Sequence, residues 1–400
     1  MEMVEHQEIV IVGGGISGLA ISLALHRKGI KSIVLERYNT LRCNGAGLIM
    51  MTNGWKALHH LGIADELRKS SIRTNSGHRI LMNGEKVKLN LGNGGEVRCL
   101  KREELVRVLF ESLPAGTIRF GCRVVSVEID AVSESIVHLD DGRNIRAKLI
   151  IACDGVHSKI CDELGLPPMK VTSTSVIRGF TEYANGHGLP PEFRIHTSNK
   201  GQFGYIPISE NSVYWFITRI TNPDDCNILG NKEGILESAL DFVKEYDEKE
   251  IMMVKKTDRR ILGITPNLIL RSPFDLLRCR FRKGTVTVAG DALHAMGPFQ
   301  AQGGSLSLED AVVLVQCVER CIEVGPEGAA AVGKGIEKAL DEFFEKRKMR
   351  LFWIMSQTYL IGVLVSSIPS KVLKFVAIFL LAAVYGRDPA AHVRYDCGPL

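Results

Sequence analysis

Short, largely apolar runs recur along the chain, and each leads into a glycine or an acidic residue. Residues 8–12, 32–36, 149–153 and 285–289 are such runs, rich in valine and isoleucine. Both faces of a strand in a parallel sheet are covered by helices, so an unbroken apolar run is typical of such a strand. A helical segment, residues 19–28, follows the first run and is closed by Gly29. The pattern predicts an α/β domain built on a parallel sheet.

A second pattern occupies residues 77–98 and 171–272, where polar and apolar residues alternate, as in 212–218. Alternation is typical of strands with one buried face, which predicts a second sheet. The chain has 400 residues, 45% of them hydrophobic and 24% charged, which suits two cooperating globular domains. Its formal net charge of +5 is modest, and no nucleic-acid-binding signature accompanies it.

The first apolar run leads directly into Gly13-Gly-Gly-Ile-Ser-Gly18 and then into a helix. Gly13 permits the tight turn, Gly15 lets the backbone approach a pyrophosphate, and Gly18 allows close packing of helix on strand. Ser17 lies inside this loop, and Glu36, which ends the second run, is placed to accept hydrogen bonds from ribose hydroxyls. The motif predicts an ADP-containing cofactor, and at this point NAD and FAD are both open.

Two further motifs distinguish this chain from a simple NAD-dependent dehydrogenase. Asp154-Gly155 follows the run at 149–153, and Gly290-Asp291 ends the run at 285–289. Together with the glycine loop, and in this order, they resemble the group A flavoprotein monooxygenases over roughly residues 8–350. The most similar members are the plant salicylate-hydroxylase-like and zeaxanthin-epoxidase-like enzymes.

This resemblance implies a Rossmann-type, glutathione-reductase-like FAD-binding domain, an interleaved β-sheet substrate domain and C-terminal helices. We expect the FAD-binding domain to comprise residues 1–75, 100–165 and 276–345. The substrate domain would comprise residues 76–99 and 166–275, and residues 346–400 would form the helical C-terminal segment.

The resemblance also implies an activity. NADH or NADPH would reduce the FAD, and a flavin C4a-hydroperoxide would then hydroxylate or epoxidise a small aromatic, alkaloid or isoprenoid substrate of plant secondary metabolism. The preference for NADH or NADPH, the substrate and the oligomeric state stay open. No side chain is nominated for acid–base catalysis.

Residues are carried over from the family position by position. Glu36 and Arg37 would contact the adenosine, Asp154 and Gly155 the phosphates, and Asp291 the ribityl chain. The remaining positions expected to contact the cofactor are Arg42, Ala46, Gly47, Arg102, Val125, Pro298, Gly303, Gly304 and Ser305. The family usually has glycine and asparagine where this chain has Ala301 and Ser305. Both changes are compatible with binding through backbone amides.

Aromatic residues of the second sheet are candidates for lining a substrate pocket. They are Phe203 and Tyr205, with Phe299 from the third motif, and Trp215 and Phe216 are further candidates on a neighbouring strand. The alternative is that some of them fill the core, because neighbours on a strand face opposite sides.

The ten cysteines form no Cys-x-x-Cys pair and no pattern with histidine, so no metal site is expected. The first seven residues are neither apolar nor arginine-rich, which favours a cytoplasmic protein. Residues 360–365 and 372–385 are strongly apolar, yet the longer run has only 14 residues, short of the ~20 that span a bilayer. Two interpretations stay open: helices packed on the protein or on a partner subunit, and peripheral contact with a membrane.

Three alternatives to the monooxygenase remain. A flavin halogenase would carry a Trp-x-Trp-x-Ile-Pro segment, and residues 202–207 lack both tryptophans. A dehydrogenase or reductase would oxidise NAD(P)H without inserting oxygen. A non-catalytic FAD-binding sensor would hold FAD that NAD(P)H does not reduce.

Overall fold

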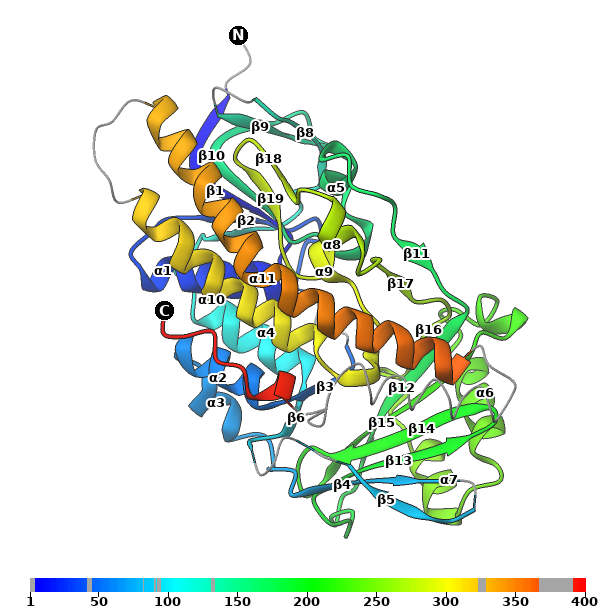
Figure 1. Ribbon diagram of the computed structural model, residues 1–400. Helices are drawn as coiled ribbons and strands as arrows, with labels where there is room; N and C mark the ends of the chain where they lie inside the picture. The colour runs from blue at the N-terminus through cyan, green and yellow to red at the C-terminus, as the bar shows by residue number, and fades with distance from the viewer. Residues whose placement is uncertain are drawn as a thin grey trace.

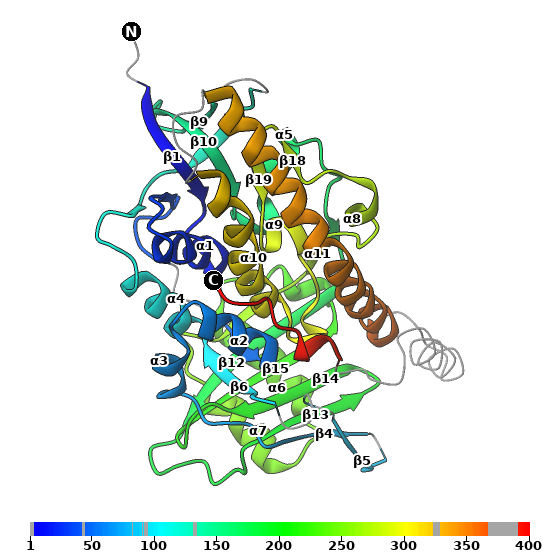
Figure 2. The same cartoon turned by 60° about the vertical axis from the view of Figure 1, so that its left-hand side comes forward.

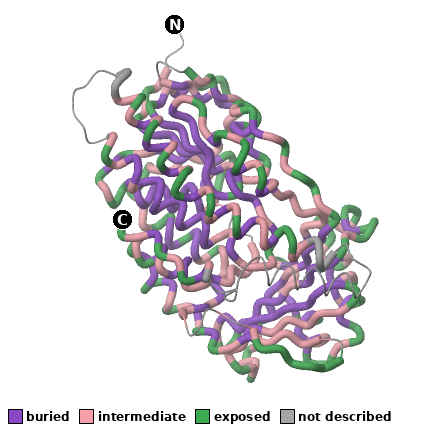
Figure 3. Tube along the Cα trace, viewed as in Figure 1, coloured by how far each residue is buried: buried purple, intermediate pink, exposed green. Residues whose placement is uncertain are grey.

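The computed structural model describes residues 4–41, 45–81, 83–89, 91, 95–130, 134–322, 329–366 and 391–400. The molecule is elongated, with one sheet and its covering helices at one end and a second sheet at the other (Figures 1 and 2). Buried residues are concentrated in the strands of both sheets and in the helices that cover the first sheet (Figure 3).

The first sheet has the order β18-β19-β10-β1-β2-β7, with β8 and β9 joined to β10 as an antiparallel extension. Its strands are β1 (Glu5–Val12), β2 (Ile33–Leu35), β7 (Ile118–Arg119), β8 (Val124–Glu128), β9 (Ser135–Leu139), β10 (Asn144–Ala152), β18 (Arg282–Lys283) and β19 (Val286–Val288). β1 pairs in parallel with β10 and β2, and β10 pairs in parallel with β19. The four apolar runs therefore form the parallel sheet that the sequence predicts.

Helices cover this sheet and link it to the rest of the molecule. They are α1 (Ile16–Arg27), α2 (Thr52–His60), α3 (Ala64–Arg68), α4 (Arg102–Glu111), α5 (Lys159–Glu163), α8 (Asp275–Arg278), α9 (Asp291–His294), α10 (Gly303–Ile322) and α11 (Ala329–Ser366). α10 packs on both α1 and α11, and the C-terminal residues 391–400 return to contact α2. Short 3-10 turns are η1 (Gly155–His157), η2 (Pro223–Asp225), η3 (Pro298–Gln300) and η4 (Ala391–Arg394).

The second sheet has the order β16-β12-β15-β14-β13-β4-β5, and its pairings are antiparallel except that between β13 and β4. Its strands are β4 (Ser76–Ile80), β5 (Lys86–Lys88), β12 (Thr174–Glu182), β13 (Glu192–Ser198), β14 (Gly201–Pro207), β15 (Ser212–Ile220) and β16 (Gly263–Thr265). Helices α6 (Lys232–Val243) and α7 (Glu248–Lys255) pack against one face. The other face is turned toward β3 (Gly47–Met50), which pairs with β6 (Arg98–Lys101).

The expected domain limits can be compared with these elements. The strands of the first sheet lie in the segments assigned to the FAD-binding domain, and those of the second sheet in the segments assigned to the substrate domain. The short ribbon of β11 (Lys170–Val171) and β17 (Ile269–Leu270) also lies in the latter. β6 crosses the expected limit at residue 99, and α11 runs without a break across the limit at residue 345. The division into domains stays a prediction.

The described cysteines are all free thiols. Of the apolar C-terminal runs, residues 360–365 belong to the end of α11, and residues 372–385 lie outside the described residues. Among the described helices, none combines the length and the apolar character needed to cross a membrane.

Candidate cofactor site

The glycine loop between β1 and α1 has the geometry of a phosphate cradle. Gly13 has a φ of +109°, and a Cβ there would lie 2.5 Å from the carbonyl oxygen of Cys153. A Cβ on Gly18 would collide with the carbonyl oxygen of Gly13, whereas one on Gly15 would meet no atom within 4 Å. Gly13 and Gly18 are therefore required by packing. Gly15 borders open space at the N-terminus of α1, where backbone N–H groups favour an anionic phosphate.

Glu36 stands at the end of β2 and faces the same loop. Its side chain is buried, and its carboxylate accepts hydrogen bonds from the backbone N–H groups of Gly14 at 2.8 Å and Tyr38 at 3.0 Å. Arg37 is exposed, with its guanidinium 4.9 Å from the centre of the Tyr38 ring. The carboxylate is thus held beside the glycine loop, where an adenosine ribose would lie.

The three motifs meet at the carboxyl ends of adjacent parallel strands. Gly13 contacts Cys153 at the end of β10, and Gly290, after β19, packs against Ser17 with a φ of +62°. The carboxyl ends of parallel strands are where open α/β sheets bind their ligands. Motifs that are far apart in the sequence therefore form one continuous site.

Asp154 is a half-buried acid in this site. One carboxylate oxygen accepts a hydrogen bond from the Lys159 N–H at 3.2 Å, and the other is buried without a partner in the described part of the chain. Burial raises the pKa of the Asp154 carboxyl. Beside it, Gly155 has a φ of +79°, and a Cβ there would meet no atom within 4 Å. A buried acceptor next to open space suits a hydrogen-bonding cofactor.

Asp291 is the first residue of α9, with Gly290 in the N-cap position, and its side chain is exposed. It stands beside the glycine loop because Gly290 contacts Ser17. This position agrees with the expected role toward the ribityl chain, which stays a prediction.

The loop before α10 provides the remaining wall. Pro298 and Phe299 lie in η3, and Ala301 follows with a φ of +53°, the one non-glycine residue with positive φ among the described residues. Glycine adopts this conformation without the steric cost that alanine carries, which explains the family's usual glycine here. Gly303 begins α10, and a Cβ there would meet no atom within 4 Å. Ser305 is buried, with its Oγ 3.2 Å from the Met50 sulfur.

A buried polar network supports this loop from behind. Asn53 donates hydrogen bonds to Gln302 at 2.8 Å and to Glu309 at 2.7 Å. Glu309 is paired with Arg347 at 2.6 Å and with Arg350 at 2.7 Å. The network thus ties α2 and α11 to the residue that precedes Gly303. Sequence reasoning did not identify Asn53, Gln302, Glu309 and Arg347 as members of a network.

Asp310 extends the network to the third motif. It is paired with Arg347 at 2.8 Å and with His294 at 2.8 Å, and it accepts a hydrogen bond from the Gly290 N–H at 3.0 Å. Burial alone would raise the pKa values of Glu309 and Asp310, but the neighbouring cations hold both below their ordinary values. His294 is thus held by a buried hydrogen bond to Asp310.

For the other residues expected to contact the cofactor, the structure gives at most a position, and no feature that points to the cofactor. The Arg102 N–H, at the start of α4, donates to the Ala46 carbonyl at 3.2 Å, and a Cβ on Gly47 would collide with the Tyr214 ring. Val125 lies in β8 with a side chain that is 47% exposed, and Arg42 lies outside the described residues. Their roles toward FAD stay predictions.

The structure argues against Phe203 and Tyr205 as substrate contacts. Both side chains are fully buried in the apolar cluster that joins the second sheet to α6 and α7, on the face away from β3. Trp215 is in the same cluster. Phe299 contacts Gly297 and Gly362, which places it against α11.

The face turned toward β3 carries other aromatic residues, which sequence reasoning missed apart from Phe216. Phe180, Tyr214 and Phe216 form a cluster here, with the Phe180 and Tyr214 ring centres 5.2 Å apart and those of Tyr214 and Phe216 6.0 Å apart. Tyr214 and Phe216 alternate with Val213 and Trp215, so period-two spacing separates the two sets but does not tell which set turns toward β3.

A cavity of about 360 Å³ opens beside this cluster, between the start of α4 and the second sheet. Gly45 and Arg102 line one side, and Phe180 and Ile261 the other. Two ion pairs lie at its border, Lys101 with Glu182 at 2.9 Å and Arg260 with Asp258 at 2.7 Å.

Comparison with known proteins identifies the family of this chain. A family model described as an FAD binding domain matches residues 6–323. The chain is 45% identical to Monooxygenase 1 of Arabidopsis thaliana over 98% of this chain and 99% of that protein. It is 32% identical to Monooxygenase 2 of the same plant over 100% of both chains. The fold is similar to the crystal structure of Klebsiella pneumoniae HpxO complexed with FAD and uric acid, with a TM-score of 0.76, 21% identity and coverage of 94% and 92%.

These matches confirm the predicted α/β fold and the predicted cofactor. With its three motifs meeting at one edge of the parallel sheet, the chain belongs to the family of FAD-dependent monooxygenases of the salicylate-hydroxylase type, and it is an oxidoreductase that uses FAD.

Proposed function

We propose that the protein uses NADH or NADPH to reduce its FAD and adds one oxygen atom from O₂ to a small, flat, apolar substrate. Among the aromatic, alkaloid and isoprenoid compounds expected from the family resemblance, those with planar or conjugated systems fit this description. The observation that carries the proposal is the aromatic cluster of Phe180, Tyr214 and Phe216, which lies on the face turned toward β3 and contributes Phe180 to the neighbouring cavity.

β3 connects the two halves of this site. On one side, a Cβ on Gly47 would collide with the Tyr214 ring. On the other side, a Cβ on Gly304 would lie 4.0 Å from the Leu48 side chain and 3.8 Å from the Met50 side chain. A substrate held against the aromatic face would therefore lie close to the start of α10. Burial raises the pKa of the Tyr214 hydroxyl above its ordinary value of 10, so this hydroxyl is uncharged at neutral pH and well above it.

The residues present fit FAD. The glycine loop would bind the pyrophosphate, Glu36 the adenosine ribose and Asp291 the ribityl chain. The N-terminus of α10 at Gly303 and Gly304 would stabilise negative charge on the reduced ring, because unpaired N–H groups concentrate there. When bound, FAD would supply hydride acceptance and oxygen activation.

The chain's own contribution is to orient the substrate and exclude water. The aromatic side chains provide a dry surface, and shielding from water is what prevents wasteful release of reduced oxygen. The fold neighbour HpxO has been solved with uric acid, a flat ring system, which agrees with a planar substrate.

The test is to follow NADH and NADPH oxidation by the FAD-loaded protein under ¹⁸O₂ with phenolic, indolic and isoprenoid compounds. We expect at least one compound to speed the oxidation and to gain one heavy oxygen. Faster oxidation that yields only hydrogen peroxide, with every compound, would favour a reductase without oxygen insertion. FAD that neither nucleotide reduces, with or without compounds, would favour a sensor.

A further inference from the structure

Large apolar side chains are exposed on the outer side of α8 and α11. Phe274 and Leu277 are 54% and 44% exposed, and Met349 and Trp353 are 48% and 44% exposed. The Phe274 ring centre lies 6.0 Å from that of Phe352, which lies 5.4 Å from that of Trp353. The side chains of the two helices therefore form one continuous patch, which we call the α8–α11 surface and define by Phe274, Leu277, Met349 and Trp353. Exposed patches of this kind mark interaction sites.

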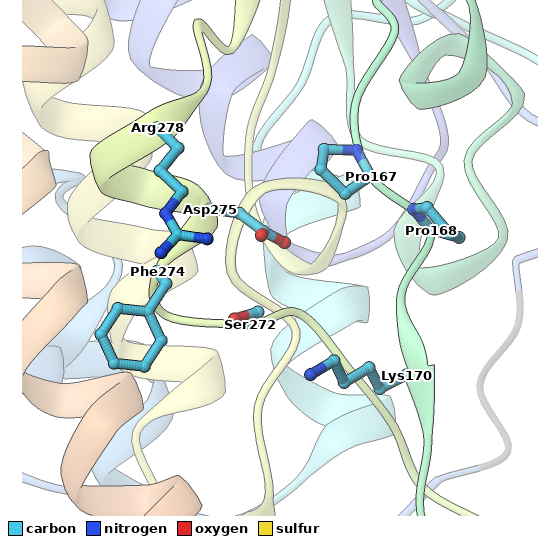
Figure 4. A pocket seen from close by; sticks show the side chains of 7 residues that line it. All are labelled: Pro167, Pro168, Lys170, Ser272, Phe274, Asp275 and Arg278. Carbon is cyan, nitrogen blue, oxygen red and sulfur yellow. The ribbon is translucent and has the colours of Figure 1, made fainter.

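Unpaired cations border the α8–α11 surface. Phe274, Lys170 and Arg278 line a cavity of about 310 Å³ (Figure 4), and the Arg278 guanidinium lies 6.0 Å from the Phe274 ring. Among the described residues, no carboxylate lies within 4.0 Å of the charged nitrogens of Lys170 or Arg278. The one acid in the cavity, Asp275, lies 3.9 Å from the buried Arg271.

We propose that the α8–α11 surface binds an anionic lipid bilayer. Exposed aromatic and aliphatic side chains beside lysine and arginine are the combination that enters the headgroup region, where apolar groups are buried and cations meet lipid phosphates and carboxylates. A second copy of the chain is a poorer occupant, because a two-fold contact would bring the same unpaired cations together. This inference goes beyond the oxygenation proposed above and does not depend on it.

The experiment uses the FAD-loaded full chain and vesicles of phosphatidylcholine, alone or mixed with phosphatidylserine. We expect co-sedimentation with the mixed vesicles only, and weaker binding as salt is raised. Two double variants test the surface, Phe274→Ser with Trp353→Ser and Lys170→Gln with Arg278→Gln. Each double variant should weaken partitioning of the protein onto the mixed vesicles by about tenfold or more. The first removes apolar area that the headgroup region would bury, and the second removes two cations that would each add to binding at an anionic surface.

A matched control removes two exposed apolar side chains elsewhere, Val87→Ser with Leu229→Ser, which are 42% and 61% exposed. It should bind like the unchanged protein, and all variants should retain FAD and its absorbance spectrum. The proposal is overturned if the unchanged protein does not co-sediment with the mixed vesicles, or if both surface variants bind these vesicles as tightly as the control does. A salt-resistant dimer that the Phe274 and Trp353 changes dissociate, seen by sedimentation velocity, would instead assign the surface to a second copy.

Discussion

At the scale of single residues, a substitution at Gly15 should test cofactor binding without disturbing the fold. A Cβ there would meet no protein atom within 4 Å, so Gly15→Ala should fold normally while its methyl group occupies the space proposed for the pyrophosphate. We expect FAD to bind at least about tenfold more weakly, since direct approach of the phosphate to the backbone N–H groups is lost. Fluorescence titration of the apoprotein with FAD measures this.

The control for that experiment is Gly333→Ala in α11. Gly333 also has open space around its Cβ position, and its φ is not positive, so alanine should leave FAD affinity unchanged. Equal affinity of both variants would mean that the glycine loop does not hold the pyrophosphate.

Arg347 is the residue on which the buried network depends. It is fully buried between Glu309 and Asp310, so Arg347→Met would leave two buried carboxylates with fewer cations. Removing one partner of a buried pair typically costs about 3–5 kcal/mol of unfolding free energy. Urea denaturation at a fixed excess of FAD measures the loss, and Lys348→Met, which removes a surface pair with Glu345, should cost no more than about 1 kcal/mol. A similar loss of unfolding free energy in Arg347→Met and Lys348→Met would mean that the buried ion pairs stabilise the protein no more than the surface pair does.

At the scale of elements, the two faces of β14 and β15 should differ in function. Phe216→Ala on the face toward β3 should alter KM and raise the share of NAD(P)H oxidation that ends in hydrogen peroxide. Phe203→Leu on the face toward α6 and α7 should lower stability, by about 1 kcal/mol if the cavity closes, and leave that share unchanged. Steady-state kinetics with peroxide detection distinguishes the two. A raised peroxide yield in Phe203→Leu alone would restore the substrate role that the sequence predicts for this residue.

The strands and the motif loops could be predicted because local sequence determines them. The run ending at Val12 is apolar on both faces, and Gly13 and Gly18 occupy positions where a Cβ would collide with backbone oxygen. Which face of β14 turns toward β3 could not be predicted, because α6 and α7, which cover Phe203 on the opposite face, follow later in the chain. Arg347 was missed for a similar reason. A cation on a charged helix is interpreted as a solvated side chain until its partners on α10 are known.

At the scale of the whole molecule, the buried carboxylates couple stability to pH. The pKa values of Glu309 and Asp310 lie below their ordinary values of 4.5 and 3.8 in the folded protein. A group with a depressed folded pKa contributes stability that is fully present above its unfolded pKa and is lost as pH falls through the folded value. The contribution should therefore be complete above about pH 4.5 and should decline below it.

The variant Glu309→Gln with Asp310→Asn removes this titration. It should be less stable than the unchanged protein at about pH 7, and the difference in unfolding free energy should narrow as pH is lowered from about 5 toward about 3, because only the unchanged protein loses ionised pairs. Denaturation at a series of pH values, at one FAD excess, gives the comparison, and Glu237→Gln on the exposed side of α6 is the control. If the difference in unfolding free energy stayed constant with pH, the hydrogen-bond geometry of these carboxylates, and not their charge, would be what stabilises the contact between α10 and α11.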